Sequence, residues 1–477
     1  MYPDEATYYL FYSAFVILFA SALWRLGQIG QRPKNYPPGP PTLPIVGNLH
    51  LIPREKRHIQ FQAWAREYGP IYSLMVGTKV MVVLNSDTAI KDVIDKRGAT
   101  YSSRPESYIA QDILSGGLRV LFMACVLNTS SNPASILLLP ELMALTIRCS
   151  AAQPWSLELR PTWRAKPCFW GCWRNQMTSS NTSAVPILRR LPDFALPIKK
   201  EGKSLHQREL KLFKDLFIGA KKGLRDGTAK KDEGFSDDLA GYLMGSLLQA
   251  GSETTSNVLV AFVQAMVLFP DAARAAQAQL DRVCGDAMPD LDDMPKLQYV
   301  RACAKESLRM MPGFMLGVPH AVTRDDEYMG YHIPKGATVI MNVWYMNDSQ
   351  TSIDAANNPD VTKRDHFSFG AGRRQCQGMH IADRSIYLAI SRLLWAFDFG
   401  RALDLDGGQV KPDMSDLAEG IMTQPKPFPA DIRPRSHARA ACVRREWEQV
   451  ARMLDRESQW ETVPEGLIWK DEHHFDE

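Results

Sequence analysis

The sequence lacks the paired cysteines of a metal site or a disulfide framework. Eight cysteines are scattered along 477 residues, and none forms a C-x-x-C pair. Cys168 and Cys172 lie closest together, and no histidine stands near them to complete a zinc site. This usage is typical of a reducing compartment that faces the cytosol, where structural disulfides are rare.

The sequence also lacks an excess of charge of one sign. Its formal net charge is +3, from 56 basic and 53 acidic residues. Nucleic-acid binding would need clustered basic residues with an aromatic platform, so this charge balance gives no argument for a nucleic-acid partner. An apolar fraction of 45% is ordinary for a globular protein, and the length suits one large α-rich enzyme domain.

One long run near the start of the chain carries no charge. Residues 7–24 are apolar or aromatic, with Asp4 and Glu5 before them and Arg25 after them. A helix of this length reaches across a hydrocarbon core of about 30 Å. Because basic residues mark the cytoplasmic flank, residues 1–28 are predicted to be a single-pass anchor with the rest of the chain in the cytosol. A cleaved signal peptide is the alternative, but the preceding acidic residues and the lack of a cleavage site argue against it.

A proline-rich segment separates the predicted anchor from the rest of the chain. Four prolines surround Gly39 between positions 37 and 41. Proline fixes φ and removes a backbone donor, so residues 29–48 are predicted to be a stiff hinge. Residues 49–430 then form the globular domain, and residues 431–477 a charged helical tail.

Hydrophobic periodicity predicts a mainly α fold with small β-sheets. Ser236 is a helix-start signal, and the short apolar runs around Gly77 predict a hairpin. The expected helices are 59–68, 88–97, 209–225, 237–270, 271–284, 292–311 and 380–397. The expected strands are 71–76, 80–84, 317–322 and 337–343. Residues 123–185 show no sustained period, and a structureless insert of this length is unusual inside a domain.

A glycine-rich loop around Cys376 is the strongest candidate site. Glycines on both sides of the cysteine allow a tight bulge in which the backbone approaches a ligand closely. Backbone N–H groups and the positive end of the helix that follows favour a thiolate, which can ligate iron. A structural cysteine in a glycine loop is the alternative. The loop residues are Phe369, Gly370, Gly372, Arg374, Cys376 and Gly378.

This F-G-x-G-x-R-x-C-x-G string resembles the haem-binding loop of the cytochromes P450. The resemblance implies the fold of that family and a haem b whose iron takes Cys376 as its axial ligand. It also implies that Arg374 meets a haem propionate. The anchor and hinge resemble those of microsomal members. The string MHIADRS resembles fungal secondary-metabolism members of the O-methylsterigmatocystin oxidoreductase type.

A second motif lies in the middle of the long predicted helix 237–270. Ala250, Gly251, Glu253 and Thr254 stand where glycine and hydroxyl residues weaken the i→i−4 ladder and bend the axis. The string resembles the A-G-x-E/D-T oxygen-activation site of the same family. The resemblance implies that Thr254 donates to dioxygen and that Glu253 passes protons inward. A simple helix kink is the alternative.

Glu306 and Arg309 share a helix face and resemble the E-x-x-R pair of the family. The resemblance implies a buried structural ion pair beneath the cysteine loop, whereas a surface pair of this spacing would carry little meaning. His320 stands where the family places a basic residue against a propionate, although a lone histidine is often simply part of a core. Residues that the resemblance places in the substrate pocket are Val318, Ile421 and Met422.

Two segments depart from the family pattern. Residues 345–366 lack a P-E-R-F-type segment, and Arg364 there is a poor match. In 123–185, Trp170 and Arg174 have the spacing of the W-x-x-x-R contact to haem, but prolines upstream argue against an intact helix. A deletion or a mistranslated stretch would explain both departures.

The resulting hypothesis is a monooxygenase in the endoplasmic reticulum membrane with a cytosolic catalytic domain. It would use haem b, O₂ and NADPH through a flavoprotein reductase to oxidise a lipophilic small molecule, in fungal secondary metabolism or xenobiotic oxidation. One alternative is a catalytically impaired or haem-poor relative that acts as a membrane-tethered interaction protein. The other is a haem-thiolate isomerase or dehydratase, against which the Glu253–Thr254 pair argues.

Overall fold

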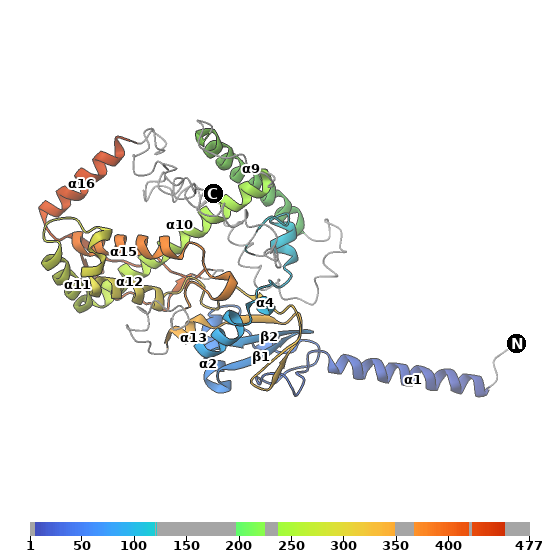
Figure 1. The fold of residues 1–477 in the computed structure, drawn as a ribbon. Helices are drawn as coiled ribbons and strands as arrows, with labels where there is room; N and C mark the ends of the chain where they lie inside the picture. Colours follow the sequence, from blue (N-terminus) through green and yellow to red (C-terminus); the bar gives the residue numbers. More distant parts are fainter. Residues whose placement is uncertain are drawn as a thin grey trace.

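The structure is a computed structural model, and it describes residues 5–119, 121, 197–224, 237–348, 367–418 and 422–453. Helices make up most of this part of the chain, and the largest sheet lies on one side of the helical body (Figure 1). The α-helices are α1 (Glu5–Gln28), α2 (Arg57–Tyr68), α3 (Asp87–Ile90), α4 (Gly98–Tyr101), α9 (Pro197–Leu224), α10 (Asp237–Leu268), α11 (Pro270–Val283), α12 (Gln298–Met310), α13 (Val343–Asp348), α15 (Met379–Ala396) and α16 (His437–Ala451). The short 3₁₀ or π turns are η1 (Leu49–Leu51), η2 (Lys91–Asp95), η3 (Tyr108–Ile113), η7 (Leu291–Lys296) and η9 (Gly372–Arg374). The strands are β1 (Ile71–Val76), β2 (Lys79–Leu84), β3 (His320–Ala321), β4 (Asp326–Tyr328), β5 (Tyr331–Ile333), β6 (Thr338–Met341), β7 (Phe397–Gly400), β8 (Leu417–Ala418), β9 (Gln424–Pro425) and β10 (Asp431–Pro434).

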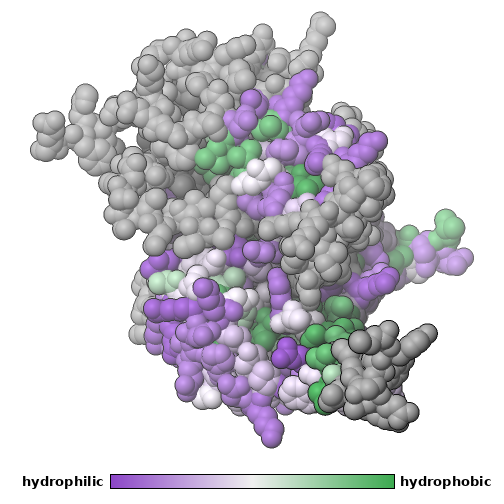
Figure 2. Space-filling view, turned by 90° about the vertical axis from the view of Figure 1, so that its right-hand side faces the viewer, coloured by the Kyte–Doolittle hydropathy of each residue, from purple (hydrophilic) through white to green (hydrophobic). Residues whose placement is uncertain are grey.

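Helix α1 is continuous over 24 residues and projects away from the body (Figure 1). Its apolar side chains are exposed, with Tyr12, Ile17 and Leu18 retaining 68%, 67% and 70% of their accessible surface. Within the described residues, no single helix is long and apolar enough to cross a membrane. Helices α10 and α11 reach the length and hydropathy of a membrane span only when they are taken together, and they are bent by 105° where they meet. Figure 2 faces the side from which α1 projects, where hydrophobic residues gather in a few patches among hydrophilic ones.

The predicted hinge, residues 29–48, is docked against the sheet and does not stand free as a spacer. The N–H of Ser73 in β1 donates to the carbonyl of Pro38 at 2.7 Å. The guanidinium of Arg32 donates to the carbonyl of Gly39 at 2.8 Å. Gly39 is required, because a Cβ there would lie 2.2 Å from the carbonyl oxygen of Ser73. Proline removes N–H donors but keeps its carbonyls, so the segment can still accept hydrogen bonds from an edge strand.

The main sheet has the strand order β1-β2-β6-β3. The predicted hairpin is confirmed: β1 and β2 pair antiparallel from Ile71↔Leu84 to Val76↔Lys79. Strand β6 then runs parallel to β2. The strand expected at 317–322 is shorter and consists of the two residues of β3, which pair antiparallel with β6.

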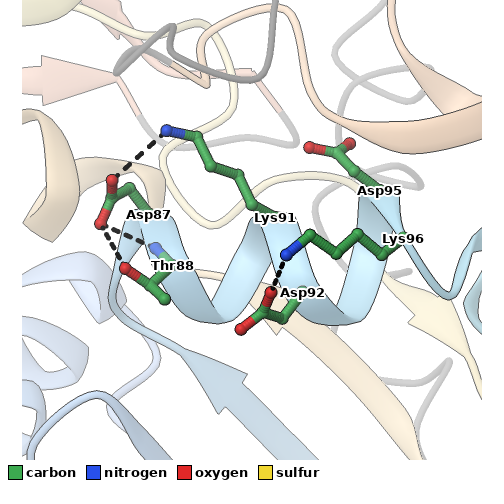
Figure 3. A pocket seen from close by; sticks show the side chains of 6 residues that line it. All are labelled: Asp87, Thr88, Lys91, Asp92, Asp95 and Lys96. Atoms are coloured by element: carbon green, nitrogen blue, oxygen red, sulfur yellow. Dashed lines mark hydrogen bonds and ion pairs between the residues drawn. The ribbon is translucent and has the colours of Figure 1, made fainter.

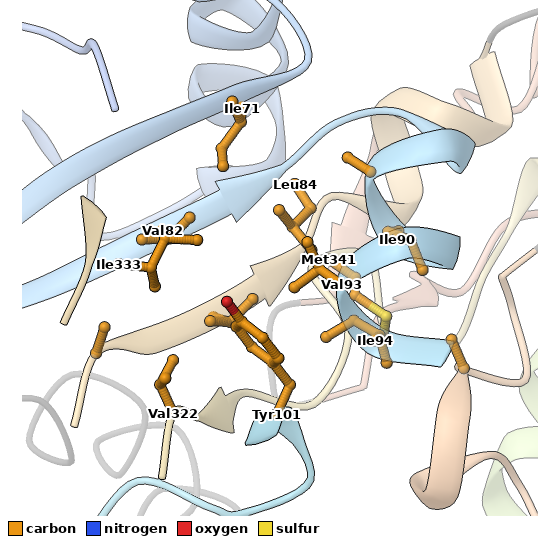
Figure 4. Close-up of a cluster of buried hydrophobic side chains, with 14 of the residues drawn as sticks. Ile71, Val82, Leu84, Ile90, Val93, Ile94, Tyr101, Val322, Ile333 and Met341 are labelled. Atoms are coloured by element: carbon orange, nitrogen blue, oxygen red, sulfur yellow. The ribbon is translucent and has the colours of Figure 1, made fainter. Parts of the chain in front are cut away.

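One apolar core joins this sheet to the short helices that follow it. Figure 4 shows side chains of β2 and β6 facing those of α3, η2 and α4. Each fully buried aliphatic side chain of this kind contributes about 1.5–3 kcal/mol. The largest fully buried members of the cluster are Ile71, Leu84, Ile90, Ile94 and Tyr101.

A second core holds the helical part together. Helices α10, α11, α12 and α15 pack on one another around residues that are almost wholly buried. The members with no measurable exposure are Phe262, Ala276, Leu280, Leu297, Val300, Ile390, Leu394 and Trp395. The single helix expected at 292–311 is divided into η7 and α12, because Pro295 inside η7 has no N–H to donate to a continuous α-helix.

The described part of the tail is tied to the second core by arginine side chains. Arg439 is 9% exposed and donates to the carbonyl of Trp395 at 3.0 Å and to Asp281 at 2.9 Å. Arg435 donates to the same Asp281 at 2.7 Å. Of the segment predicted as a helical tail, 431–477, residues Asp431–Pro434 form strand β10 and residues His437–Ala451 form helix α16, and residues 454–477 lie outside the described residues.

A buried ion pair joins the segment before residue 120 to helices α9 and α10. Arg119 and Glu209 form the pair with side chains that are only 5% and 8% exposed. Tyr242 of α10 donates to Glu209 at 2.6 Å, and Gln249 accepts from Arg119 at 2.9 Å. Because both charges are removed from water, each depends on the other for its stabilisation.

Replacing Arg119 with alanine is expected to lower the free energy of unfolding by about 3–5 kcal/mol, because Glu209 would remain buried without its counter-ion. The matched control is Arg274→Ala, since the Arg274–Asp271 pair has side chains 67% and 92% exposed. That control should cost no more than about 1 kcal/mol. Urea unfolding followed by circular dichroism measures both, and equal losses would contradict the ion-pair argument.

Candidate functional site

The cysteine loop is a tight turn between the main sheet and α15. The N–H of Cys376 donates to the carbonyl of Phe369 at 2.8 Å, which closes the loop on itself. Gly370 and Gly372 have φ of 76° and 61°, a region that other residues rarely adopt. A Cβ on Gly372 would lie 2.5 Å from the carbonyl oxygen of Ile94, so the loop approaches η2 backbone to backbone. The glycines of the motif are therefore needed for this shape.

Cys376 as a whole residue is exposed, but the chain packed around it still desolvates the thiol. Desolvation by the surrounding chain raises the pKa of the Cys376 thiol, while the N–H of Gly378 acts in the opposite direction. From the sequence, we expected the N–H groups of the loop to favour the thiolate form of Cys376. The expected N–H contribution is found, but the net direction is upward, because desolvation of a charged sulfur outweighs one backbone donor.

Three basic side chains converge beside this loop. Arg374 donates from Nε to the carbonyl of Ser102 at 2.9 Å. Arg104 is 6% exposed and donates to the carbonyls of Val318 and Pro319 at 3.0 and 2.7 Å. Arg104 is not among the residues predicted from the sequence.

His320 is the third member of this basic cluster and is 2% exposed. Its Nδ1 lies 2.7 Å from the carbonyl oxygen of Tyr101, so Nδ1 carries the proton of the neutral ring. Burial, followed by the charges of Arg104 and Arg374, lowers the pKa of His320 to about 3. Burial and Arg374 also lower the pKa of Arg104 to about 9. Both shifts follow first from burial and then from the positive charge of neighbouring arginines.

The donor set of this region fits a haem. The partners of Arg104 in the described residues are carbonyl oxygens and no carboxylate. An anion placed beside these side chains would offset the repulsion between Arg104 and Arg374 and accept charge-assisted hydrogen bonds from them. The propionates of a haem supply such anions, and a cysteine sulfur a few residues from Arg374 supplies an iron ligand.

The motif in α10 does not interrupt the helix. Helix α10 is continuous over Asp237–Leu268, and Thr254 donates from Oγ1 to the carbonyl of Ala250 at 2.6 Å. The expected break is therefore absent, because the threonine hydroxyl bonds the carbonyl one turn earlier. Ala250 and Gly251 are exposed, and a Cβ on Gly251 would meet nothing within 4 Å. The side chain of Glu253 lies outside the described residues.

Glu306 and Arg309 of α12 form the expected ion pair. Arg309 donates from Nε to Glu306 at 2.8 Å, and it also donates to the carbonyl of Asn347 at the end of α13. The side chains are 50% and 30% exposed, so the burial expected for this pair is not found. Within the described residues, the pair connects α12 to α13, and its structural role stays a prediction.

The remaining predicted residues fall in different places. Val318 is half-buried, and its carbonyl accepts from Arg104 at 3.0 Å. Met422 is half-buried beside Thr423, whose N–H donates to the carbonyl of Gly313 at 3.0 Å. Predicted residues outside the described part are Ile421, Trp170, Arg174 and Arg364.

Comparison with known families identifies the fold. The family model described as Cytochrome P450 matches residues 37–124 and 182–430, and the range 125–181 lies between the two matches. The chain belongs to the cytochrome P450 family. Most of the segment that the sequence analysis found irregular, 123–185, falls in the unmatched range. Membership in the P450 family implies a haem cofactor.

Fungal P450 enzymes are similar to this chain over almost its whole length. Cytochrome P450 monooxygenase fogE of Aspergillus ruber is 49% identical, over 96% of this chain and 97% of the relative. Monooxygenase virE of Hypocrea virens is 48% identical, over 95% of each chain. Monooxygenase fsoB of Humicola fuscoatra is 40% identical, over 94% and 96%. The predicted resemblance is confirmed, and the protein is an enzyme of the P450 monooxygenase type.

Among solved structures, a zebra fish cytochrome P450, in a structure described with abiraterone, matches with a TM-score of 0.55. The match covers 80% of this chain and 100% of that chain, at 22% sequence identity. At this identity the likeness supports the fold, and it agrees with the mainly helical body and small sheets described above.

Arg104 could have been found from one signal in the sequence. It stands before Pro105, and a proline biases the preceding residue towards extended backbone and away from helix. An arginine there is held beside the sheet, close in space to a loop 270 positions further along the chain. Sequence spacing alone does not reveal that proximity.

Replacing Arg104 with leucine should reduce haem retention about tenfold, as expected for the loss of one charge-assisted hydrogen bond. Haem content per protein chain, measured as the pyridine haemochromogen, gives the result. Arg324→Leu is the control, because Arg324 is exposed and donates to Thr100 Oγ1 at 3.1 Å. Equal haem contents in the two variants would remove Arg104 from the propionate site.

Proposed function

We propose that this P450 inserts one oxygen atom of O₂ into an apolar organic substrate, with electrons from NADPH through a flavoprotein reductase. The observation that carries the proposal is the placement of Cys376 in a glycine turn next to the cluster of Arg104, His320 and Arg374. The similarity to fungal P450 monooxygenases supports a role in fungal secondary metabolism. Oxidation of xenobiotics is the other use of the same chemistry.

In this proposal, the sulfur of Cys376 would bind the iron of haem b, and Phe369, Gly370, Gly372 and Gly378 shape the loop that would hold the group. Haem with a thiolate ligand supplies the activation of dioxygen, because the sulfur pushes electron density towards O–O cleavage. The N–H of Gly378 lies near the sulfur and moderates its charge. Arg104, Arg374 and His320 would hold the carboxylates of the group and so orient it.

Proton delivery is assigned to α10. Thr254 Oγ1 donates to the carbonyl of Ala250 at rest and can turn to donate into the exposed space beside Gly251. Glu253, which directly precedes Thr254 in the sequence, is proposed to replace the proton that Thr254 gives. Val318, Ile421 and Met422 are proposed to line the apolar end of the substrate site, where desolvation of the substrate favours binding.

The reduced carbon-monoxide difference spectrum tests the assignment of the sulfur. The purified protein should show the strongly red-shifted Soret band of a thiolate-ligated haem. Cys376→Ser should abolish that band. Cys442→Ser is the control, because Cys442 is another free cysteine of the described residues, in α16. A band that survives Cys376→Ser would disprove the assignment, and a protein without haem would favour the haem-poor alternative.

The reductase partner is proposed from the charge of the surface near the loop. Arg373 is exposed and directly precedes Arg374, so an acidic flavoprotein can approach there. A haem-thiolate isomerase or dehydratase would need no electron donor. Substrate-dependent NADPH consumption with added reductase separates the two functions. The near full-length similarity to monooxygenases does not favour the impaired alternative.

No single described helix meets the length and hydropathy of a membrane span. We nevertheless propose helix α1 as a single-pass anchor in the endoplasmic reticulum membrane, because residues 7–24 carry no charge. Tyr12, Phe15 and Leu18 are 68%, 65% and 70% exposed on a helix of 24 residues, and such a surface is stable only when apolar matter covers it. Arg25 in the last turn marks the cytosolic flank. A lipophilic substrate would then reach the site from the bilayer.

Removing residues 1–28 is expected to shift the protein from the membrane pellet to the supernatant after carbonate extraction. The physical reason is the loss of the apolar helix, whose transfer into lipid holds the chain in the membrane. Immunoblotting of both fractions measures the shift. Truncation of residues 454–477 provides the control and should leave the distribution unchanged. A pelleted protein after loss of α1 would contradict the anchor.

A further inference from the structure

The turn that precedes the cysteine takes its cap from a distant part of the chain. The turn η9, Gly372–Arg374, begins after Ala371, whose side chain has no oxygen with which to accept a hydrogen bond. The first N–H of the turn, on Gly372, donates to Oδ1 of Asp95 at 2.6 Å. Asp95 lies 277 positions earlier, at the end of η2. An N–H at the start of a turn needs such an acceptor, and a carboxylate is a strong one.

The local structure before Asp95 explains why its side chain reaches the loop. Residues Lys91–Asp95 form a π turn, in which Lys96 N–H donates to the carbonyl of Lys91 at 3.0 Å. A π turn holds one more residue than an α turn, so the side chains after it point in a different direction from those of a regular helix. The helix expected at 88–97 is therefore not regular, and this irregularity directs Asp95 towards the loop.

The neighbouring acidic side chains of the same helical segment behave differently. Figure 3 shows Asp87 joined to Thr88 and Lys91, and Asp92 joined to Lys96. No dashed line joins Asp95 to any of the residues drawn. Its hydrogen bond goes to the cysteine loop instead.

Two further contacts show that this end of η2 and the loop are fitted together. A Cβ on Gly372 would lie 2.5 Å from the carbonyl oxygen of Ile94, so only glycine allows the approach. A Cβ on Gly98 would lie 3.4 Å from Cγ of Arg373, so the next loop residue packs on the start of α4. The loop therefore has backbone, side-chain and hydrogen-bond contacts with the same short stretch.

From these contacts we propose that Asp95 is a positioning residue for the haem-binding loop, which fixes Gly372 and thereby the place of Cys376 four residues later. Asp95 acts through the loop and touches neither substrate nor the sulfur. The inference rests on the proposed role of Cys376 as the iron ligand. Loss of the Asp95 carboxylate would let the turn η9 open, and the sulfur would leave its position more often.

The test compares Asp95→Ala, Asp95→Asn and the matched control Asp92→Ala in the full-length protein. The red-shifted band of the reduced carbon-monoxide adduct should disappear about tenfold faster in Asp95→Ala than in the wild-type protein, as expected for one lost charge-assisted hydrogen bond. Asp95→Asn keeps an acceptor oxygen and should partly restore the wild-type rate. Asp92→Ala should match the wild type, and far-ultraviolet circular dichroism should be the same in all four proteins.

Hydrogen exchange of the peptide that contains Gly372 gives a second reading that does not need haem. Asp95→Ala should speed exchange of that peptide about tenfold, and Asp92→Ala should not. Equal exchange in the two variants would overturn the positioning role. If Asp95→Ala does not fold, Asp95→Asn compared with Asp92→Asn decides in the same way. A wild-type protein without the red-shifted band would instead refute the proposed function, and the exchange experiment would still decide the role of Asp95.

Discussion

The constraint on which the proposed site depends is the convergence of three basic side chains beside the cysteine loop. Arg104, His320 and Arg374 come from three separate parts of the chain, and they meet where little water remains. Burial, and after it the positive charge of neighbouring arginines, lowers the pKa values of Arg104 and His320. A bound anion would offset the cost of burying this positive charge, which is the basis for the proposal that the cluster holds the carboxylates of a haem.

The two cores position this cluster and the loop. The sheet core holds η2, α4 and β3 in place. Asp95 is the last residue of η2, Arg104 follows α4, and His320 begins β3. The helical core fixes the start of α15, which follows Cys376 directly, against α10. The loop therefore lies between the two cores, and Gly372 allows its backbone to pass close to η2. Precise placement of a ligand atom requires this kind of support from surrounding elements.

The membrane and the reductase proposed as partners would contact different parts of the molecule. The exposed apolar helix α1 supports the proposed membrane, and the proline segment, docked on β1 through Ser73, holds the first part of the chain close to the folded body. The exposed Arg373 supports an acidic electron donor on the side of the loop. A substrate from lipid and electrons from a soluble flavoprotein domain would then arrive from different directions.

The sequence by itself determined the family, because the cysteine string and the A-G-S-E-T string are local and need only their spacing to be recognised. It also predicted the hairpin and most helices, since hydrophobic periodicity is local too. Only the tertiary structure brought Arg104 and Asp95 to the loop, because contacts between residues more than 200 positions apart leave no pattern in one sequence. It likewise decided that Thr254 keeps α10 continuous and that the hinge is docked, because both depend on where a hydroxyl or a carbonyl finds its hydrogen-bond partner.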